Sequence, residues 1–316
     1  MKVAVKELVE KVSRLGQKPI NEDSLPELLR EKLKLLRRDG YVVLDHLVGS
    51  KEFAKLANLV KELYEERLKF NTPCLAQNYI DESRHFELIK RNFKINVEEL
   101  DKHGLLFHHD DIHSYDQVIK DFGPSTLTID MPSDTSFYDL WLDENVIRIV
   151  SAYMGFVPIM REAFIRRNFP CKYPVMNHKW HRDTNHRLHL LKSFIFFTDC
   201  DLETGAHHYI PGSIGAQNFQ ENRYYDDEEV NEAFPLADGK QMISRVPAGT
   251  IIIEDTRGLH KAGIPKRGYR DLGFSVFLPH SFLHHGKPYF SIEKKTYELL
   301  SPGQKPFIPS RSIVDS

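Results

Sequence analysis

Residues 180–183 read Trp-His-Arg-Asp and end a segment, residues 176–183, whose pattern predicts a β-strand. Side chains two positions apart on a strand point to the same face, so we expect His181 and Asp183 to reach one ion together. Far downstream, an apolar Ile-Ile-Ile strand leads to His260, with room between for several strands to return it beside the pair. Two imidazoles and one carboxylate on one face, with other positions open, are the ligands typical of non-haem Fe(II) oxygenases. His181, Asp183 and His260 are therefore the candidate metal ligands and catalytic residues.

The spacing of apolar residues differs on the two sides of this motif. Helical spacing of apolar residues predicts helices at residues 3–15, 25–36, 51–70 and 138–154, and residues 41–44 predict a short strand after Asp39-Gly40. Later β-rich runs predict strands at residues 163–165, 176–183, 188–198, 206–210, 249–254 and 270–278. Several short strands after a helical start predict an α+β, mainly β fold, in which helices buttress one face of an antiparallel double sheet.

We expect the 316 residues to form a single domain, since the pattern shows no internal repeat. Residues 1–125 are predicted to form a helical N-terminal part with a lid-like segment at 71–125, where no firm period is found. Residues 126–290 are predicted to hold the sheet core. The Pro- and Ser-rich end of residues 291–316 is predicted to be a tail that wraps the surface or frays.

The composition narrows the class of protein. Lys and Arg number 43 and Asp and Glu number 45, giving a formal net charge of −2, so no basic excess favours a nucleic-acid partner. Hydrophobic residues make up 41% and charged residues 28%, which is typical of a globular chain. No stretch approaches the roughly 20 apolar residues that span a bilayer, and the N-terminus lacks a signal peptide's apolar region. Three cysteines without a CxxC motif indicate a reducing, cytoplasmic location.

Arg270 begins a strand with an apolar inward face. Alternation over residues 270–278 places Arg270 on the same face as Leu272, Phe274 and Val276. A guanidinium there is costly unless an anion meets it, and its planar fork suits a carboxylate at two points. The anion is either an internal Glu or Asp or the carboxylate of a cosubstrate whose other end chelates the metal, and the triad favours the cosubstrate.

Taken together, these motifs resemble the phytanoyl-CoA dioxygenase-like (PhyH) family of Fe(II)- and 2-oxoglutarate-dependent oxygenases. The resemblance rests on residues 38–44 with the helix after them, residues 180–183, residues 196–205 with 210–213, the 249–260 strand, and Arg270. It implies a double-stranded β-helix (jelly-roll, cupin-like) core with the metal at one mouth. It also implies that His181, Asp183 and His260 bind iron and that Arg270 binds the distal carboxylate of 2-oxoglutarate.

Two positions bear on the cosubstrate and substrate contacts. Asn168, on the strand before the metal motif, matches a position that can touch the cosubstrate, and a strand-end cap is the equal alternative. Ile214 departs from the pattern, because many members carry a histidine after the Pro-Gly-Ser segment. That departure concerns substrate contacts more than metal binding.

The expected function is an Fe(II)- and 2-oxoglutarate-dependent dioxygenase that uses O₂ to hydroxylate or otherwise oxidise a small molecule, releasing succinate and CO₂. Arg187, His189 and Lys192 could meet an anionic or polar substrate, or form a solvent-facing basic rim. A non-catalytic metal-binding jelly roll is one alternative. A zinc hydrolase built on the same ligands is another, and it would leave Arg270 unexplained.

Other polar residues have simpler interpretations. Residues 108–113 hold two further His-x-Asp pairs, which favour a solvated loop over a second metal site. His207 or His208 could face the pocket, although histidines on a strand surface are commoner. Glu254 or Asp255 could hold a ligand imidazole, although an acid in a turn is the simpler interpretation.

Overall fold

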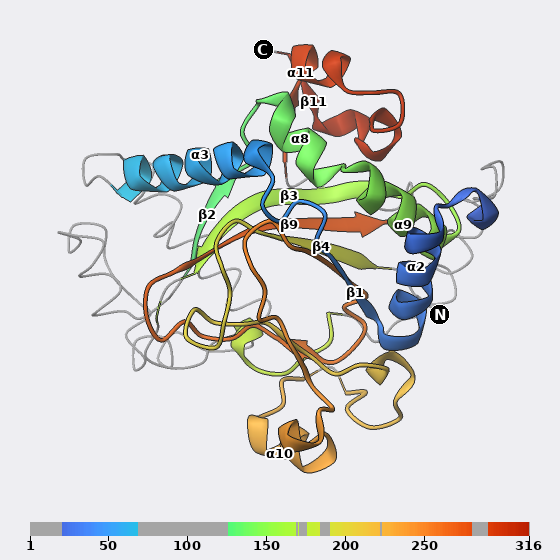
Figure 1. Cartoon of the computed structure of the whole chain (residues 1–316), viewed down its shortest axis with the longest axis vertical. Coiled ribbons are helices and arrows are strands. Elements are labelled where there is room, and N and C mark those ends of the chain that lie inside the picture. Colours follow the sequence, from blue (N-terminus) through green and yellow to red (C-terminus); the bar gives the residue numbers. More distant parts are fainter. Residues whose placement is uncertain are drawn as a thin grey trace.

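A computed structural model describes residues 21–68, 126–168, 170, 176–183, 190–221, 223–279 and 290–315. The predicted helix at 3–15, the lid-like segment at 71–125 with its His-x-Asp pairs, Arg187 and His189 all lie outside the described residues. The centre of the described fold is a six-stranded antiparallel sheet with strand order β1-β7-β4-β9-β3-β2 (Figure 1). Its strands are β1 (Tyr41–Leu44), β2 (Thr126–Asp130), β3 (Ile159–Asn168), β4 (Leu191–Phe196), β7 (Ile251–Glu254) and β9 (Arg270–Leu278).

The two faces of this sheet bury different residues. Phe194, Ile252 and Phe274 belong to one apolar cluster, and we call their side of the sheet the inner face. Strand alternation then places Lys192, Glu254, Arg166 and Asn168 on the inner face as well, and places Arg270 there as predicted. The inner face is thus apolar in the middle of the sheet and polar toward both ends of its strands.

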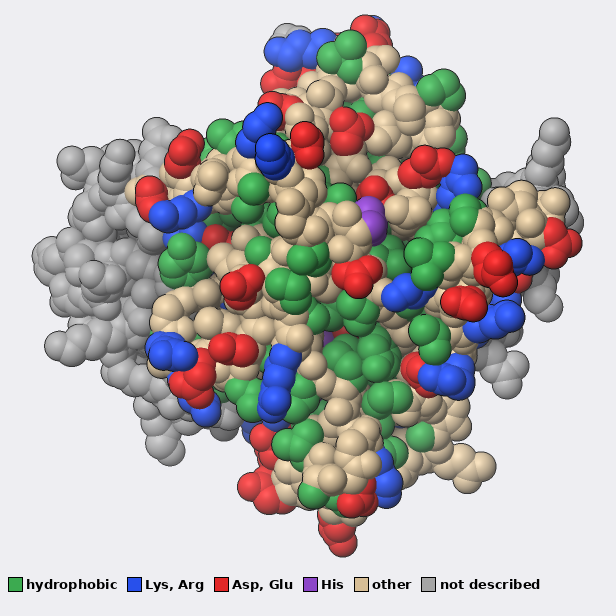
Figure 2. Space-filling model, in the orientation of Figure 1, with side chains coloured by type: hydrophobic (Ala, Val, Ile, Leu, Met, Phe, Trp, Pro, Cys, Tyr) green, Lys and Arg blue, Asp and Glu red, His purple; other side chains and the backbone are tan. Residues whose placement is uncertain are grey.

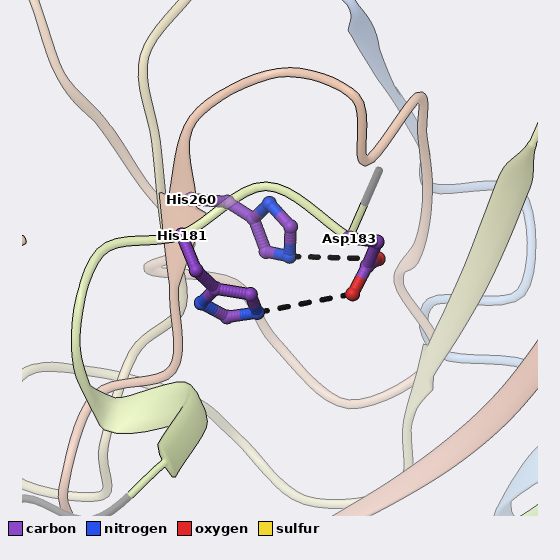
Figure 3. A group of neighbouring side chains, drawn as sticks. All are labelled: His181, Asp183 and His260. Carbon is purple, nitrogen blue, oxygen red and sulfur yellow. Dashed lines mark ion pairs between the residues drawn. The ribbon is translucent and has the colours of Figure 1, made fainter. Parts of the chain in front are cut away.

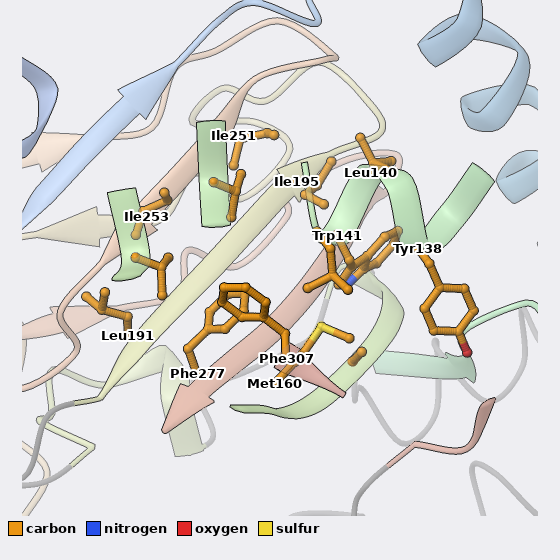
Figure 4. Packing of buried hydrophobic residues seen from close by; sticks show 14 of the residues in the cluster. Tyr138, Leu140, Trp141, Met160, Leu191, Ile195, Ile251, Ile253, Phe277 and Phe307 are labelled. Carbon is orange, nitrogen blue, oxygen red and sulfur yellow. The ribbon is translucent and has the colours of Figure 1, made fainter. Parts of the chain in front are cut away.

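Helices cover the opposite, outer face, as the sequence predicts. They are α2 (Glu27–Asp39), α3 (Lys51–Leu68), α8 (Thr135–Trp141) and α9 (Glu144–Met154). Their apolar sides join Ile195, Ile253 and Phe277 of the sheet in one large cluster (Figure 4). The Trp141 indole N–H donates to the Phe274 carbonyl at 3.0 Å, which ties α8 to β9. The core therefore lies between the helices and the outer face, and the inner face is left for the site.

The single helix predicted over residues 138–154 is wrong. The structure has two helices, α8 and α9, separated at Leu142 and Asp143. The Asp143 side chain accepts hydrogen bonds from the backbone N–H groups of Asn145 and Val146, which caps the start of α9. Apolar periodicity continues through the break because both helices bury one side against the same sheet.

A second, three-stranded sheet lies toward the inner face, with the order β6 (Met242–Ile243), β5 (His208–Tyr209), β8 (His260–Lys261). The strand predicted over residues 176–183 is wrong, because η3 (Met176–His178) is a 3-10 turn and the rest makes only isolated bridges. The described residues thus form an α+β fold with antiparallel sheets. They do not form a closed barrel.

The remaining elements lie around these two sheets. They are η1 (Glu22–Ser24), η4 (Ser213–Gly215), α10 (Asp227–Ala233), η5 (Leu236–Asp238), β10 (Ile292–Glu293), α11 (Lys294–Leu299), η6 (Lys305–Phe307), η7 (Ser310–Ser312) and β11 (Ile313–Val314). The C-terminal tail packs onto the fold, because β11 pairs with β10 and Phe307 is buried. None of the helices in the described ranges combines the length and the apolar composition needed to cross a bilayer. The face in Figure 2 mixes acidic, basic and apolar side chains.

Candidate metal centre

Two histidines and one aspartate converge on one point of the inner side of the fold (Figure 3). His181 and His260 face each other across an antiparallel bridge, in which each backbone N–H donates to the other's carbonyl at 2.9 and 3.0 Å. The Asp183 N–H donates to the Thr256 carbonyl at 3.0 Å. The Asp183 carboxylate oxygens lie 3.8 Å from His181 Nε2 and 3.7 Å from His260 Nε2. The expected trio is brought together, although by a bridge and a bend rather than by a regular strand.

Backbone carbonyls set the tautomer of both imidazoles. His181 Nδ1 lies 2.8 Å from the Lys179 carbonyl and His260 Nδ1 lies 2.9 Å from the Gly258 carbonyl. Since a carbonyl only accepts, each Nδ1 carries the hydrogen, and each Nε2 presents its lone pair toward Asp183. Burial lowers the pKa of both imidazoles, so both are neutral at pH 7. Two neutral nitrogen donors and one carboxylate fit a divalent first-row metal.

The carboxylate of this trio has a basic neighbour. Lys192, on β4, forms an ion pair with Asp183, and its side chain is only 15% exposed. Burial alone would raise the pKa of Asp183, but the Lys192 ammonium lowers it below its ordinary value. Asp183 is therefore ionised and ready to bind a cation. Lys192, one of the predicted basic rim residues, contacts the trio instead of solvent.

The Pro-Gly-Ser segment positions these ligands. The Ser213 hydroxyl accepts from the Leu259 N–H at 2.8 Å, directly before His260. The Arg182 guanidinium, between the two ligands of the first motif, donates to the Ser213 carbonyl at 2.8 Å. At Gly258 a Cβ atom would lie 1.9 Å from the Tyr209 hydroxyl oxygen, so only glycine fits there. The turn before His260 is thus fixed from both sides.

Arg270 is buried, with 2% of its surface exposed. It donates to the Gly205 carbonyl and, at 3.2 Å, to Asn168 Oδ1, while its Nε is buried without a hydrogen-bond partner. Among the described residues no carboxylate pairs with it, so the internal salt bridge considered as an alternative is not found there. Burial lowers the pKa of this guanidinium because the charge has left water. Such a group is prepared to receive an anion.

His207 and Glu254 form a separate buried pair beside the trio. His207 Nε2 lies 2.8 Å from a Glu254 carboxylate oxygen, and the His207 and His260 ring centroids are 5.6 Å apart. Burial lowers the pKa of His207 to about 3 and raises that of Glu254 well above its ordinary value. Glu254 therefore holds His207 and not a ligand imidazole. Asp255 accepts from the Tyr153 hydroxyl at 2.7 Å and also pairs with Arg257.

Some residues of this region are not found by the sequence analysis. The carbonyls that orient the imidazoles carry no sequence signal. Arg166, on the inner face of β3, does carry one, because it is in phase with Asn168 on a strand that alternates. The predicted strand was too short, at 163–165, to reveal that alternation.

Comparisons with known proteins agree with this geometry. Residues 36–264 match the phytanoyl-CoA dioxygenase (PhyH) family. A comparison with curated protein sequences gives no match. Among solved structures, EctD from S. alaskensis with 2-oxoglutarate and 5-hydroxyectoine is 16% identical, covers 95% of each chain and has a TM-score of 0.51.

A second similar structure is the epimerase SnoN in complex with Fe³⁺, alpha ketoglutarate and nogalamycin RO. It is 12% identical, covers 80% of this chain and 84% of its own, and has a TM-score of 0.49. At such identities the likeness to EctD supports the fold alone. The family match spans most of the chain and includes both metal-ligand motifs. The chain thus belongs to the PhyH family of Fe(II)- and 2-oxoglutarate-dependent oxygenases.

Proposed function

We propose that His181, Asp183 and His260 hold one Fe(II) at the mouth of a double-stranded β-helix and that the enzyme oxidises a small molecule, with hydroxylation as the expected outcome. The observation that carries this proposal is the convergence of two Nε2 lone pairs and one ionised carboxylate, all ligand atoms lying within 4.8 Å of one another. When bound with 2-oxoglutarate, the iron supplies the activation of O₂, and the cosubstrate leaves as succinate and CO₂. All three ligands lie in the expected core, residues 126–290.

The chain's own residues bind and orient the reactants. The carbonyls of Lys179 and Gly258 hold both imidazoles in the tautomer that a metal needs. Arg270 binds the distal carboxylate of 2-oxoglutarate, which is supported by its burial without an acidic partner among the described residues. Asn168 orients the guanidinium through its side-chain oxygen.

Aromatic side chains of the inner face form an apolar wall beside the proposed metal site. Phe164 and Phe274 stack with ring centroids 4.6 Å apart, and Phe194 lies 5.6 Å from Phe274. Excluding water from this wall strengthens the electrostatic contacts made by the charged groups at its edges. A zinc hydrolase would have no use for the buried guanidinium of Arg270, so the oxygenase is favoured.

The test is iron and 2-oxoglutarate binding without oxygen, followed by turnover. We expect the wild-type protein to bind one iron per chain and to develop a visible charge-transfer band when 2-oxoglutarate is added under argon. His260→Ala removes one ligand and should lose both the tightly bound iron and the band. His208→Ala, the adjacent non-ligand histidine on β5, is the matched control and should keep both.

Two results would contradict the proposal. One is a His260→Ala protein that keeps stoichiometric iron and the band, because the ligand set would then be different. The other is a wild-type protein that binds iron but forms no band with 2-oxoglutarate. Admitting oxygen and measuring succinate then separates an active enzyme from a non-catalytic binding protein.

A further inference from the structure

Arg166 carries a second guanidinium on the inner face; its side chain is half-buried, and it forms no ion pair with an acid among the described residues. It lies on β3 opposite Leu272, and its guanidinium carbon is 5.1 Å from the Phe164 ring centroid and 5.7 Å from that of Phe274. Its Nε is buried without a hydrogen-bond partner. Arg167, next in the chain and on the other face, is instead fully paired with Asp271 at 2.6 Å. Of these two neighbouring arginines, one is paired with an acid and the other is not, among the residues that the structure describes.

The place of Arg166 links it to the metal centre. The Phe274 ring that lies beside Arg166 also lies 5.2 Å from the Lys192 ammonium, and Lys192 pairs with the candidate ligand Asp183. Farther along the same face, Arg270 is close enough to lower the pKa of Arg166, in addition to the larger effect of burial. Arg166 thus lies on the wall between the metal ligands and the candidate cosubstrate anchor.

The surrounding acids do not neutralise this wall. Glu162, four residues earlier on β3, is close enough to raise the pKa of Arg166 but forms no ion pair with it, and burial raises the pKa of Glu162 itself. A buried N–H without an acceptor is destabilising, and a positively charged donor binds an anion more strongly than it binds a neutral acceptor, so the Nε–H of Arg166 favours an anion that arrives with a ligand. 2-Oxoglutarate cannot supply it, because on the proposed function one end of that dianion binds the metal and the other binds Arg270.

We propose that Arg166 binds an oxyanion of the substrate, so the substrate is a small molecule that carries a carboxylate or a phosphate. This inference rests on the proposed function, since it assigns the cosubstrate to Arg270. The two aromatic rings at Arg166 would contact the apolar part of the substrate next to its anion. The guanidinium would then hold the substrate in one orientation relative to the iron, with the oxyanion directed away from the reacting carbon.

The test uses the smallest probes of this chemistry. Wild-type protein is loaded with Fe(II) and 2-oxoglutarate under argon in a buffer without oxyanions. Acetate, methyl phosphate and the neutral acetamide are then titrated calorimetrically. The same titrations are made with Arg166→Met, with Arg166→Lys, and with Arg148→Met, which removes an exposed arginine that pairs with Glu144 on α9.

We expect saturable binding of acetate or methyl phosphate and no saturable binding of acetamide. Arg166→Met should weaken the binding by about 10- to 150-fold, the range for a lost hydrogen bond to a charged group. Arg166→Lys should bind more tightly than Arg166→Met because it keeps the charge. Arg148→Met should bind like wild type, and the 2-oxoglutarate concentration that half-saturates the band should not change in any variant. Which anion binds better separates a carboxylic acid from a phosphate ester.

Several outcomes would overturn the inference. If neither acetate nor methyl phosphate binds saturably to a wild-type protein that forms the charge-transfer band, the role of Arg166 is refuted and the proposed function is not. An Arg166→Met protein that binds the anion normally, or one with weakened 2-oxoglutarate binding, also refutes the role of Arg166. If Arg166→Met does not fold, Arg166→Lys is compared with wild type instead. The affinity of Arg166→Lys for the anion must then be equal to that of wild type or at most about tenfold weaker. Absence of the band in wild type refutes the proposed function itself.

Discussion

Replacing Arg270 by lysine should weaken 2-oxoglutarate binding without affecting iron. In the wild-type protein the guanidinium donates to the Gly205 carbonyl and to Asn168 Oδ1 and still has its Nε–H free. A lysine ammonium has three hydrogens on one atom and lacks the planar fork. It cannot satisfy both protein acceptors and also hold a carboxylate at two points.

The size of the effect follows from the burial of the site. Arg270 is 2% exposed, so water cannot replace a lost donor. A hydrogen bond to a charged group contributes about 1.5–3 kcal/mol, and the substitution removes one of two such bonds to the cosubstrate. The dissociation constant for 2-oxoglutarate should therefore rise by about 10- to 150-fold. Iron binding should change little, because Arg270 is not among the three ligands.

The assay is a 2-oxoglutarate titration of the charge-transfer band in the Fe(II)-loaded protein under argon. Arg267→Lys is the matched control, since Arg267 is 75% exposed and lies 3.9 Å from Glu203. It should leave the titration unchanged. An Arg270→Lys protein with the wild-type dissociation constant would refute the reasoning and make Arg270 a structural residue.

Three further predictions concern stability. Burial lowers the pKa of His207 to about 3 in the folded protein, against about 6.5 in the unfolded chain. The contribution of His207 to the free energy of unfolding is therefore present in full above pH 6.5 and is lost as the pH falls toward 3. Urea unfolding of the metal-free protein should show that wild type loses about 2 kcal/mol more than His207→Gln between pH 7 and pH 5; equal losses would refute it. Gly273→Ala should lower the free energy of unfolding by about 1–3 kcal/mol, because its Cβ would lie 2.7 Å from Trp141, whereas Gly215→Ala, with open space around it, should not. Arg167→Met should cost about 3–5 kcal/mol by leaving its buried carboxylate partner unpaired, and a change below 1 kcal/mol would contradict that account.

Local patterns predict the regular elements well where one physical cause dominates. The strands Tyr41–Leu44 and Arg270–Leu278 match their predicted bounds, since turn residues precede both and alternation or apolar content runs to their ends. Gly40, at φ 86°, ends α2 as predicted because only glycine adopts that conformation at no cost. The helix predicted over 138–154 fails, because a capping aspartate interrupts a helix without interrupting the apolar periodicity.

The site residues also divide into those that a pattern in the sequence reveals and those that it does not. The candidate residues His181, Asp183, His260 and Arg270 are recognisable from residue type and order, since the proposed metal and carboxylate binding needs particular side chains. The groups that orient the two imidazoles are backbone carbonyls, which any residue supplies, so the sequence cannot reveal them. Recognising Arg166 from the sequence would require the length of its strand, β3. That length depends on pairing with the distant strand β9 rather than on local propensity.

The most direct measurement of the central claim is a crystal structure of the protein with Mn(II), as a redox-inert substitute for Fe(II), and 2-oxoglutarate, with anomalous scattering recorded for the metal. The account predicts one strong peak per chain bonded to His181 Nε2, His260 Nε2 and an Asp183 carboxylate oxygen, with the distal carboxylate of 2-oxoglutarate on Arg270. A metal bound elsewhere, or bound without Asp183, would contradict it.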